Sequence, residues 1–450
     1  MDDGNRLETV KGWRRTIGFA LPSMAMMLFI SSYTMVDGAF ISNLMDTDAL
    51  AACNILMPLF SVLTGLGFMF ATGGSAYVAN LMGRGEDDRA RGAFTSIVLF
   101  AVAVAMILTV LSLVFMEPLV GFLGADEVLK AGSMEYGTVI SVFCVFFILQ
   151  YVFNQMLIVA GRPSLSLALS VAGGLTNIIL DYVFIGVVGW GLTGAAIASG
   201  CGALIPTVVG LVLFSRGGMT LRFRKPVRDP SVIISTCTNG ISEMASELSG
   251  GITTLLFNVT MMEYVGPDGV SAITILMYAQ FLAIATVIGY SNGVAPVMSY
   301  NHGKGDREGM QGLYRISMMF VLVFSVAAFV VMESFSSYIV GFFAEGSDGV
   351  MGIAVAGAAV FAFAFLAMGF NVYASSLFTS LSNGLVSALI SVMRSLLLLA
   401  PLIVLLPMSF GIGAVWYAVP VTEFATLVLS VLLMLVLGRG YGFIKGVPRG

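Results

Sequence analysis

The chain has 450 residues, of which 58% are hydrophobic and 10% charged, with a formal net charge of −4. Soluble domains carry about 25% charged residues, so this composition excludes a water-soluble globular protein, and we expect no nucleic-acid partner. The single histidine and the spacing of the four cysteines predict neither a histidine-based metal centre nor a disulfide framework. No cofactor is expected.

The elements expected along the chain are membrane-spanning helices. The N-terminus is polar, and the apolar stretch after it is longer than that of a signal peptide, which indicates a retained first span. Apolar segments of about 20 residues, the length of a transmembrane helix, then recur to the end, without the short alternating pattern of barrel strands. In chain order the twelve predicted spans are 13–43, 51–80, 93–122, 133–159, 164–188, 191–215, 232–263, 270–299, 313–343, 350–379, 383–407 and 412–438.

The basic residues predict the orientation of these spans. The N-terminal arm, the even-numbered loops and the C-terminal tail, together with the span ends beside them, hold nineteen of the twenty-one Lys and Arg. The odd-numbered loops and the span ends beside them hold Lys130 together with eleven acids. By the positive-inside rule, both termini are expected in the cytoplasm. We therefore expect an all-α integral membrane protein that works as a monomer.

The two halves of the sequence resemble one another at an offset of 220 residues. Six spans in each half would insert the same way up, which predicts a parallel repeat of two pseudo-symmetric six-helix bundles. We expect an N-lobe (1–215), a basic cytoplasmic linker (216–231) and a C-lobe (232–450). The matching stretches are NILM (54–57) with TILM (274–277), GRGEDDRARG (83–92) with GKGDREGMQG (303–312), and SLALSV (166–171) with VSALISV (386–392), the last after a one-residue shift.

Two similar bundles with a cleft between them are typical of secondary transporters that open alternately to each side. No P-loop is present, so an ion or substrate gradient would supply the energy, and an enzyme is not expected. The alternative is a repeat without transport, as in a receptor or scaffold.

Six of the ionisable residues inside the predicted spans are candidate functional residues, because a charged residue at mid-helix costs about 3 kcal/mol. They are Asp37, Asp181, Glu243, Glu247, Arg394 and Glu423.

Asp37 and Asp181 are expected at one depth in the N-lobe. They lie about six and seven residues before the outer ends of spans 1 and 5, and Ser199 lies about eight residues into span 6. Asn177 is one turn from Asp181 on the same face. This all-oxygen set predicts a site for Na⁺ or for exchangeable protons, although two separate structural acids would give the same pattern. At the offset of 220 the C-lobe has no counterpart acids.

The C-lobe has two further pairs of ionisable residues. Glu243 and Glu247 are one turn apart on span 7, where either can meet a cationic substrate or couple to protons. Arg394 and Glu423 lie about ten residues into consecutive antiparallel spans and are predicted to form a structural ion pair.

Uncharged polar residues also mark span 4. Gln150 and Asn154 share one face, as in a cavity wall or a helix–helix hydrogen bond. The 28 methionines and 33 phenylalanines offer adaptable apolar surface for varied ligands, although most such residues simply face the core or lipid.

Several motifs together resemble the multidrug and toxin extrusion (MATE) family, and within it the prokaryotic DinF and MepA-like branch. The resemblance extends over essentially the whole chain. Its motifs are MVDGAFIS (35–42), NILMPLF (54–60), GRP (161–163), TNIILDYVFI (176–185), LTGAAIAS (192–199) and NGISEMAS (239–246).

The resemblance implies a V-shaped pair of six-helix lobes that exports organic, often cationic and amphipathic compounds in exchange for H⁺ or Na⁺. It also implies that the cation site comprises Asp37, Asn177, Asp181 and Ser199, with serine where threonine is more common, and that Tyr136 lies nearby.

The resemblance further implies that an acid on span 7, Glu243 or Glu247, takes part in the cycle. A second transport function stays open, that of a lipid-linked saccharide flippase of the same superfamily. A flippase would need a basic cavity for pyrophosphate, but Arg394 is the one basic residue in the interior of a predicted span, since Arg14, Arg15 and Arg315 lie at span ends.

Overall fold

The computed structural model describes residues 6–45, 47–343 and 348–444, except the side chains of 6, 34–44, 47, 343 and 348. This part of the chain is helical and has no strand, which confirms the expected all-α fold. The first half comprises η1 (Arg6–Thr9), α1 (Trp13–Leu44), α2 (Thr47–Ile55), α3 (Met57–Gly83), α4 (Asp87–Val114), α5 (Met116–Phe122), α6 (Leu129–Val142), α7 (Cys144–Val159), α8 (Pro163–Asp181), η2 (Tyr182–Val187) and α9 (Gly191–Ser215). The second half comprises α10 (Pro230–Tyr264), α11 (Pro267–Lys304), α12 (Arg307–Phe343), α13 (Asp348–Phe361), α14 (Ala364–Ser380), α15 (Gly384–Val392), η3 (Met393–Leu397), α16 (Leu399–Phe410), η4 (Ile412–Tyr417) and α17 (Ala418–Tyr441).

The spans are not all single straight helices. Within the described residues, nine helical segments are long and apolar enough to cross a membrane, and two more spans are bent pairs, α6 with α7 at 49° and α13 with α14 at 57°. The 35-residue α10 is the twelfth, and its acids and hydroxyls make it less apolar than the others. The predicted span 51–80 is divided, because Pro58 stands at the first turn of α3 and favours a new helix start there.

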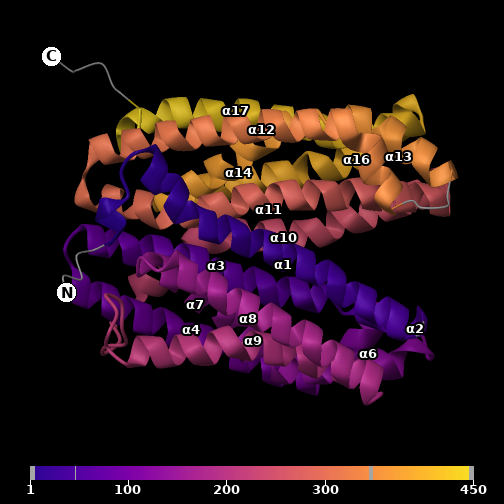
Figure 1. The fold of residues 1–450 in the computed structure, drawn as a ribbon, viewed down its shortest axis with the longest axis horizontal. Helices are drawn as coiled ribbons and strands as arrows, with labels where there is room; N and C mark the ends of the chain where they lie inside the picture. The colour runs from indigo at the N-terminus through magenta and orange to yellow at the C-terminus, as the bar shows by residue number, and fades with distance from the viewer. Residues whose placement is uncertain (1–5, 46, 344–347, 445–450) are drawn as a thin grey trace.

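The two halves form two bundles that lie side by side (Figure 1). Helices α1 to α9, indigo to magenta, fill one bundle, and α10 to α17, rose to yellow, fill the other. The bundles meet where α3 packs on α10 and where α1 packs on α11. The contact between them is therefore made mainly by the first two spans of each half.

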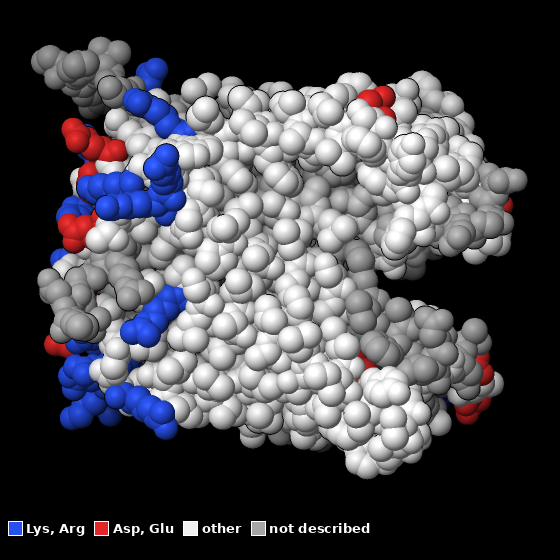
Figure 2. All heavy atoms as spheres, in the orientation of Figure 1, with Lys and Arg blue, Asp and Glu red and all other residues white. Residues whose placement is uncertain are grey.

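The surface separates into a charged end, an apolar belt and a notched end. Lys and Arg gather at the end where both termini lie, and a notch opens between the bundles at the opposite end (Figure 2). Large apolar side chains are exposed along the belt, for example Leu99, Met106 and Ile107 on α4 and Leu322 and Val323 on α12. Such a belt is suited to lipid, because helices satisfy their backbone groups internally.

Reciprocal glycine contacts close the bundles against each other near the charged end. A Cβ atom on Gly83 would overlap the carbonyl oxygen of Tyr300, and one on Gly303 would overlap the carbonyl oxygen of Asn80. The offset of 220 residues relates Gly83 to Gly303 and Asn80 to Tyr300, so one contact is the repeat of the other. The pseudo-two-fold relation between the halves is therefore present in the packing.

Candidate functional site

The N-lobe buries a polar cluster on α8 and α9. Asp181 is 0% and Asn177 3% exposed, and the Asn177 amide donates a long hydrogen bond of 3.4 Å to the hydroxyl of Ser199. The two helices come close because a Cβ on Gly173 would lie 2.6 Å from the carbonyl oxygen of Gly202. Small residues at this crossing therefore bring three of the predicted site residues to one place.

The first span approaches the same region. A Cβ on Gly174 of α8 would lie 2.5 Å from the Phe29 ring and 3.1 Å from the Tyr33 ring of α1. Asp37 follows Tyr33 by one turn in α1, but its side chain lies outside the described residues. Tyr136 is buried on α6, where its ring centroid lies 6.0 Å from that of Phe60.

Glu243 lines a polar pocket between the bundles. The α10 side chain faces α3 and α7 of the N-lobe as well as α11 and α14 of its own lobe, across a narrow space of about 10 Å³. The pocket is lined by Thr72, Ser75, Ala76, Gln155, Glu243, Asn292, Ala295, Ser376, Thr379 and Ser380. An acid among hydroxyls and amides can accept the charge of an organic cation and the hydrogen bonds of its polar groups.

Glu247 lies one turn away and has a different environment. Its carboxylate accepts a 3.4 Å hydrogen bond from Thr64 on α3, and its Cβ is 3.5 Å from the position of a Cβ on Gly65. The side chain thus bridges the two lobes rather than lining the Glu243 pocket. The two acids, one turn apart on the same helix, therefore have different neighbours.

The predicted polar face of α7 lies beside a second inter-lobe space. Gln150 is half-buried and Asn154 is 7% exposed. Asn154 lines this space with Gln155, Tyr151 and Asn292.

Gln155 and Asn292 were not among the residues singled out from the sequence. Gln155 donates a 3.1 Å hydrogen bond to the carbonyl oxygen of Asn292 across the lobes. Asn292 corresponds to Thr72 at the offset of 220, and both residues line the two inter-lobe spaces. The internal repeat is therefore the sequence feature that pairs these two polar positions.

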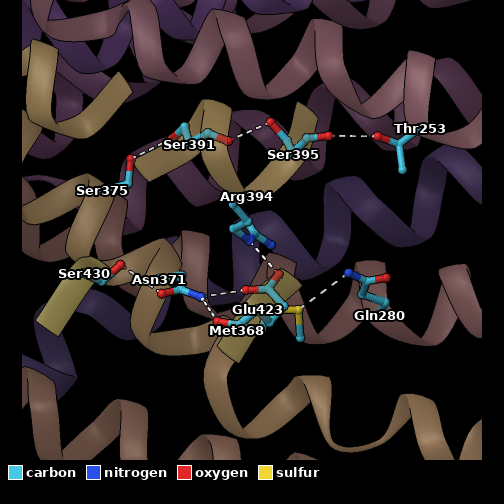
Figure 3. A network of polar contacts seen from close by, with 10 residues as sticks. All are labelled: Thr253, Gln280, Met368, Asn371, Ser375, Ser391, Arg394, Ser395, Glu423 and Ser430. Carbon is cyan, nitrogen blue, oxygen red and sulfur yellow. Dashed lines mark hydrogen bonds and ion pairs between the residues drawn. The ribbon is translucent and has the colours of Figure 1, made fainter. Parts of the chain in front are cut away.

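The core of the C-lobe contains an ion pair within a hydrogen-bond network (Figure 3). Arg394 Nε in η3 lies 2.6 Å from Glu423 Oε1 in α17. Asn371 Nδ2 of α14 donates to Glu423 Oε2 at 2.8 Å, and Ser430 donates to Asn371 Oδ1 at 2.9 Å. Both carboxylate oxygens of Glu423 therefore have strong partners.

The donor set of the N-lobe suits a hard cation or a proton. Its described groups are the carboxylate of Asp181, the amide of Asn177 and the hydroxyl of Ser199, all of which offer oxygen atoms. No group of three or more His, Cys, Asp or Glu that could hold a metal ion occurs among the residues that the structure describes.

Known proteins resemble this chain over most of its length. The multidrug export protein MepA of Staphylococcus saprophyticus is 21% identical over 403 residues, which cover 88% of each chain. MepA of Staphylococcus aureus strain MSSA476 is 23% identical over 334 residues, which cover 73% of each chain.

Solved structures share the fold. The outward-facing conformation of a multidrug resistance MATE family transporter of the MOP superfamily superposes with a TM-score of 0.91 at 18% identity, covering 98% of this chain and 99% of the other. A MOP superfamily transporter from Pyrococcus furiosus superposes with a TM-score of 0.89 at 18% identity and the same coverage. The family model described as MatE matches residues 22–183 and 247–405, more than half of the chain. Since the match extends over both halves, this chain belongs to the multidrug and toxin extrusion family of membrane transporters, in its MepA-like branch.

Proposed function

We propose that this protein is a secondary multidrug efflux antiporter that exports organic, mainly cationic and amphipathic compounds in exchange for H⁺ or Na⁺. The main observation in support of this proposal is that two acidic residues lie at different sites. Glu243 lines a polar pocket between the lobes, whereas Asp181 is fully buried in the N-lobe. Substrate and ion then bind at different places and influence each other through the packing between them.

The charge distribution supports one orientation of the protein in the membrane. The end that carries most Lys and Arg, with both termini, would lie in the cytoplasm of a prokaryotic cell. The notch would then open to the outside, in an outward-open state, with the glycine contacts closing the cytoplasmic side. Residues 216–231 would link two lobes that rock as bodies within one monomer.

The proposed cycle starts from this outward-open state. H⁺ or Na⁺ enters from outside and binds at Asp37 and Asp181, with Asn177 and Ser199 as further oxygen ligands when the ion is Na⁺. Binding repacks α1 against α8, narrows the N-lobe and releases the drug outward. The lobes then open to the cytoplasm, where the ion leaves and the next drug binds near Glu243.

A lipid-linked saccharide flippase is less well supported. Recognition of a pyrophosphate would need available basic groups in the cleft. Among the described side chains within the spans, Arg394 is basic and is already paired with Glu423. The acid Glu243 at the inter-lobe pocket favours a cation instead.

Reconstitution in proteoliposomes tests the proposal. Transport of ethidium is measured under an imposed ΔpH and, separately, under an imposed Na⁺ gradient. We expect transport under at least one gradient in the wild-type protein. We expect the transport rate to fall by at least about 90% in Asp181→Asn and in Asp37→Asn. Each variant replaces a carboxylate, which can bind and release the ion, with a neutral amide.

The control is Glu127→Gln, which removes an exposed acid from the loop before α6. It is expected to transport at the wild-type rate. Gradient-independent transport in the wild type, or near-normal transport in both aspartate variants, would contradict the proposal.

A further inference from the structure

The last spans of the two lobes match position by position at an offset of 221 residues. α8 begins at Pro163 and α15 at Gly384, while α9 begins at Gly191 and η4 at Ile412. This is the one-residue shift visible between the SLALSV and VSALISV stretches. Positions in α8 and α9 can therefore be compared directly with those in α15 to α17.

At this offset, the residues at one helix crossing differ in type between the two lobes. Gly173 and Gly202 correspond to Arg394 and Glu423. In the N-lobe the two glycines bring the backbones of α8 and α9 together. In the C-lobe the same two positions carry an ion pair, with Arg394 Nε 2.6 Å from Glu423 Oε1.

The carboxylate of the ion pair is buried, and both of its oxygens accept hydrogen bonds. The Glu423 side chain is 3% exposed and that of Arg394 is 17% exposed, and Asn371 donates to the second carboxylate oxygen. A guanidinium remains charged at any physiological pH. The place beside Glu423 where a mobile cation could bind is thus taken by a cation that belongs to the chain.

A chain of hydroxyls runs from the inter-lobe pocket toward this pair. It starts at Thr379, which lines the pocket of Glu243, and each step is 2.8 or 2.9 Å long. Hydroxyls both donate and accept, so such a chain can relay protons. Arg394 lies three residues beyond its last member in the helix, where a fixed positive charge opposes the entry of cations. The members are Thr379, Ser387, Ser375 and Ser391.

We propose that Arg394 is a built-in cation of the C-lobe, which excludes the coupling ion from Glu423 and leaves ion exchange to the N-lobe. The inference rests on the proposed ion-coupled export. Among the described residues, the titratable groups on the elements packed against α17 include Arg394, Tyr373 of α14 and Tyr417 of η4. They also include Tyr314 of α12, whose hydroxyl donates to Met434 Sδ of α17. Glu243 and Glu247 are on α10, which packs against η3.

The test replaces the arginine in the full-length protein. In Arg394→Met, infrared difference spectra between pH 5 and pH 8 are expected to show one more titrating carboxyl group than in the wild type. The number of ions exchanged per ethidium, obtained from the gradient at which flux reverses, is expected to rise by one. Arg394→Lys and Arg394→Met/Glu423→Gln are expected to keep the wild-type spectrum and ion number.

A folded Arg394→Met protein with the wild-type spectrum and ion number would overturn the inference. If that variant does not fold, Arg394→Met/Glu423→Met removes both charges, since apolar replacements of a buried pair are often tolerated. This double variant is expected to exchange the wild-type number of ions, and a different number would overturn the inference. Absence of any gradient-driven transport in the wild type would count against the proposed function alone, because the infrared measurement needs no transport.

Discussion

At the scale of single residues, Glu243 and Glu247 differ more than their spacing suggests. The sequence places them one turn apart on one helix face, so either could contact the substrate. In the structure, Glu243 lines the polar inter-lobe pocket, whereas Glu247 accepts a hydrogen bond from Thr64 on the other lobe. Substrate contact therefore belongs to Glu243 in the proposed mechanism, and Glu247 acts on the contact between lobes.

Glu243→Gln is expected to weaken the binding of an organic cation about tenfold or more, because a contact to a charged group contributes about 1.5–3 kcal/mol. A neutral amphipathic compound of similar size should bind as before. Fluorescence anisotropy with purified protein gives both dissociation constants.

Glu247→Gln is the matched control and should leave both constants within about twofold. An equal loss of cationic and neutral ligand binding in Glu243→Gln would assign that residue a structural role.

At the scale of elements, the contact between lobes depends on glycine. α3 meets α10 and α11 at positions where any side chain would collide with the facing backbone. Gly83→Ala places a methyl group against the carbonyl oxygen of Tyr300 and is expected to shift the population toward the inward-open state. Double electron–electron resonance between labels at Arg216→Cys and Arg439→Cys, in a cysteine-free background, should show longer distances.

Gly312→Ala is the control, since its Cβ would meet no atom within 4 Å. Unchanged distances in Gly83→Ala would show that this contact does not limit opening.

The N-terminal arm provides a weaker contact at the same end. Lys11 pairs with Asp306 at 3.0 Å, Glu8 pairs with Lys304, and Leu7 and Val10 are buried beneath them. The backbone N–H of Gly309 and the Lys11 ammonium lower the pKa of the Asp306 carboxyl from its ordinary value of 3.8. Since this depressed pKa makes the carboxylate stabilising above 3.8, the contribution is lost only when the pH falls through the lowered pKa.

Asp306→Asn is therefore expected to increase the inward-open population by up to about fivefold, because an exposed pair contributes about 1 kcal/mol or less. The effect should be the same at pH 5 and pH 8, as measured with the same two spin labels.

Lys130→Met is the matched control, because it breaks a 2.8 Å pair with Glu117 that lies within one lobe. An effect of Asp306→Asn that disappears at pH 5 would contradict the assigned pKa direction.

The sequence predicted the helical elements better than their interruptions. Apolar length was enough to locate the spans, since each must cross the same hydrocarbon thickness. The bends at Phe143 and at Phe363 and the short helix α2 leave little trace in composition, because bent and straight spans need the same apolar residues.

Among the candidate residues, contacts between neighbouring helices of one lobe were likewise predicted better than contacts between the lobes. Depth counting along single helices brought together Asn177 and Ser199, which the structure places in hydrogen-bond contact. Gln155 and Asn292 were missed because their contact depends on how the lobes pack, which no local pattern records. The division between Glu243 and Glu247 also required the position of α3.

At the scale of the whole molecule, charge and shape agree with one direction of transport. The basic end holds both termini, and the notch opens at the far end (Figure 2). Two similar bundles nevertheless carry different cores, with Asp181 in one and the Arg394–Glu423 pair in the other. In the proposed mechanism, a symmetric frame thus leaves ion exchange to one of its two lobes.

The reciprocal contact of Gly83 with Tyr300 and of Gly303 with Asn80 has a consequence for the origin of this asymmetry. It is the isologous contact of a two-fold homodimer, as expected if the chain arose by fusion of two copies of one six-helix ancestor. In such a homodimer every substitution appears twice, so an arginine at the position of Arg394 would also have stood at the position of Gly173. Only after duplication of the gene could one copy acquire a fixed cation while the other retained glycine beside its acidic cluster.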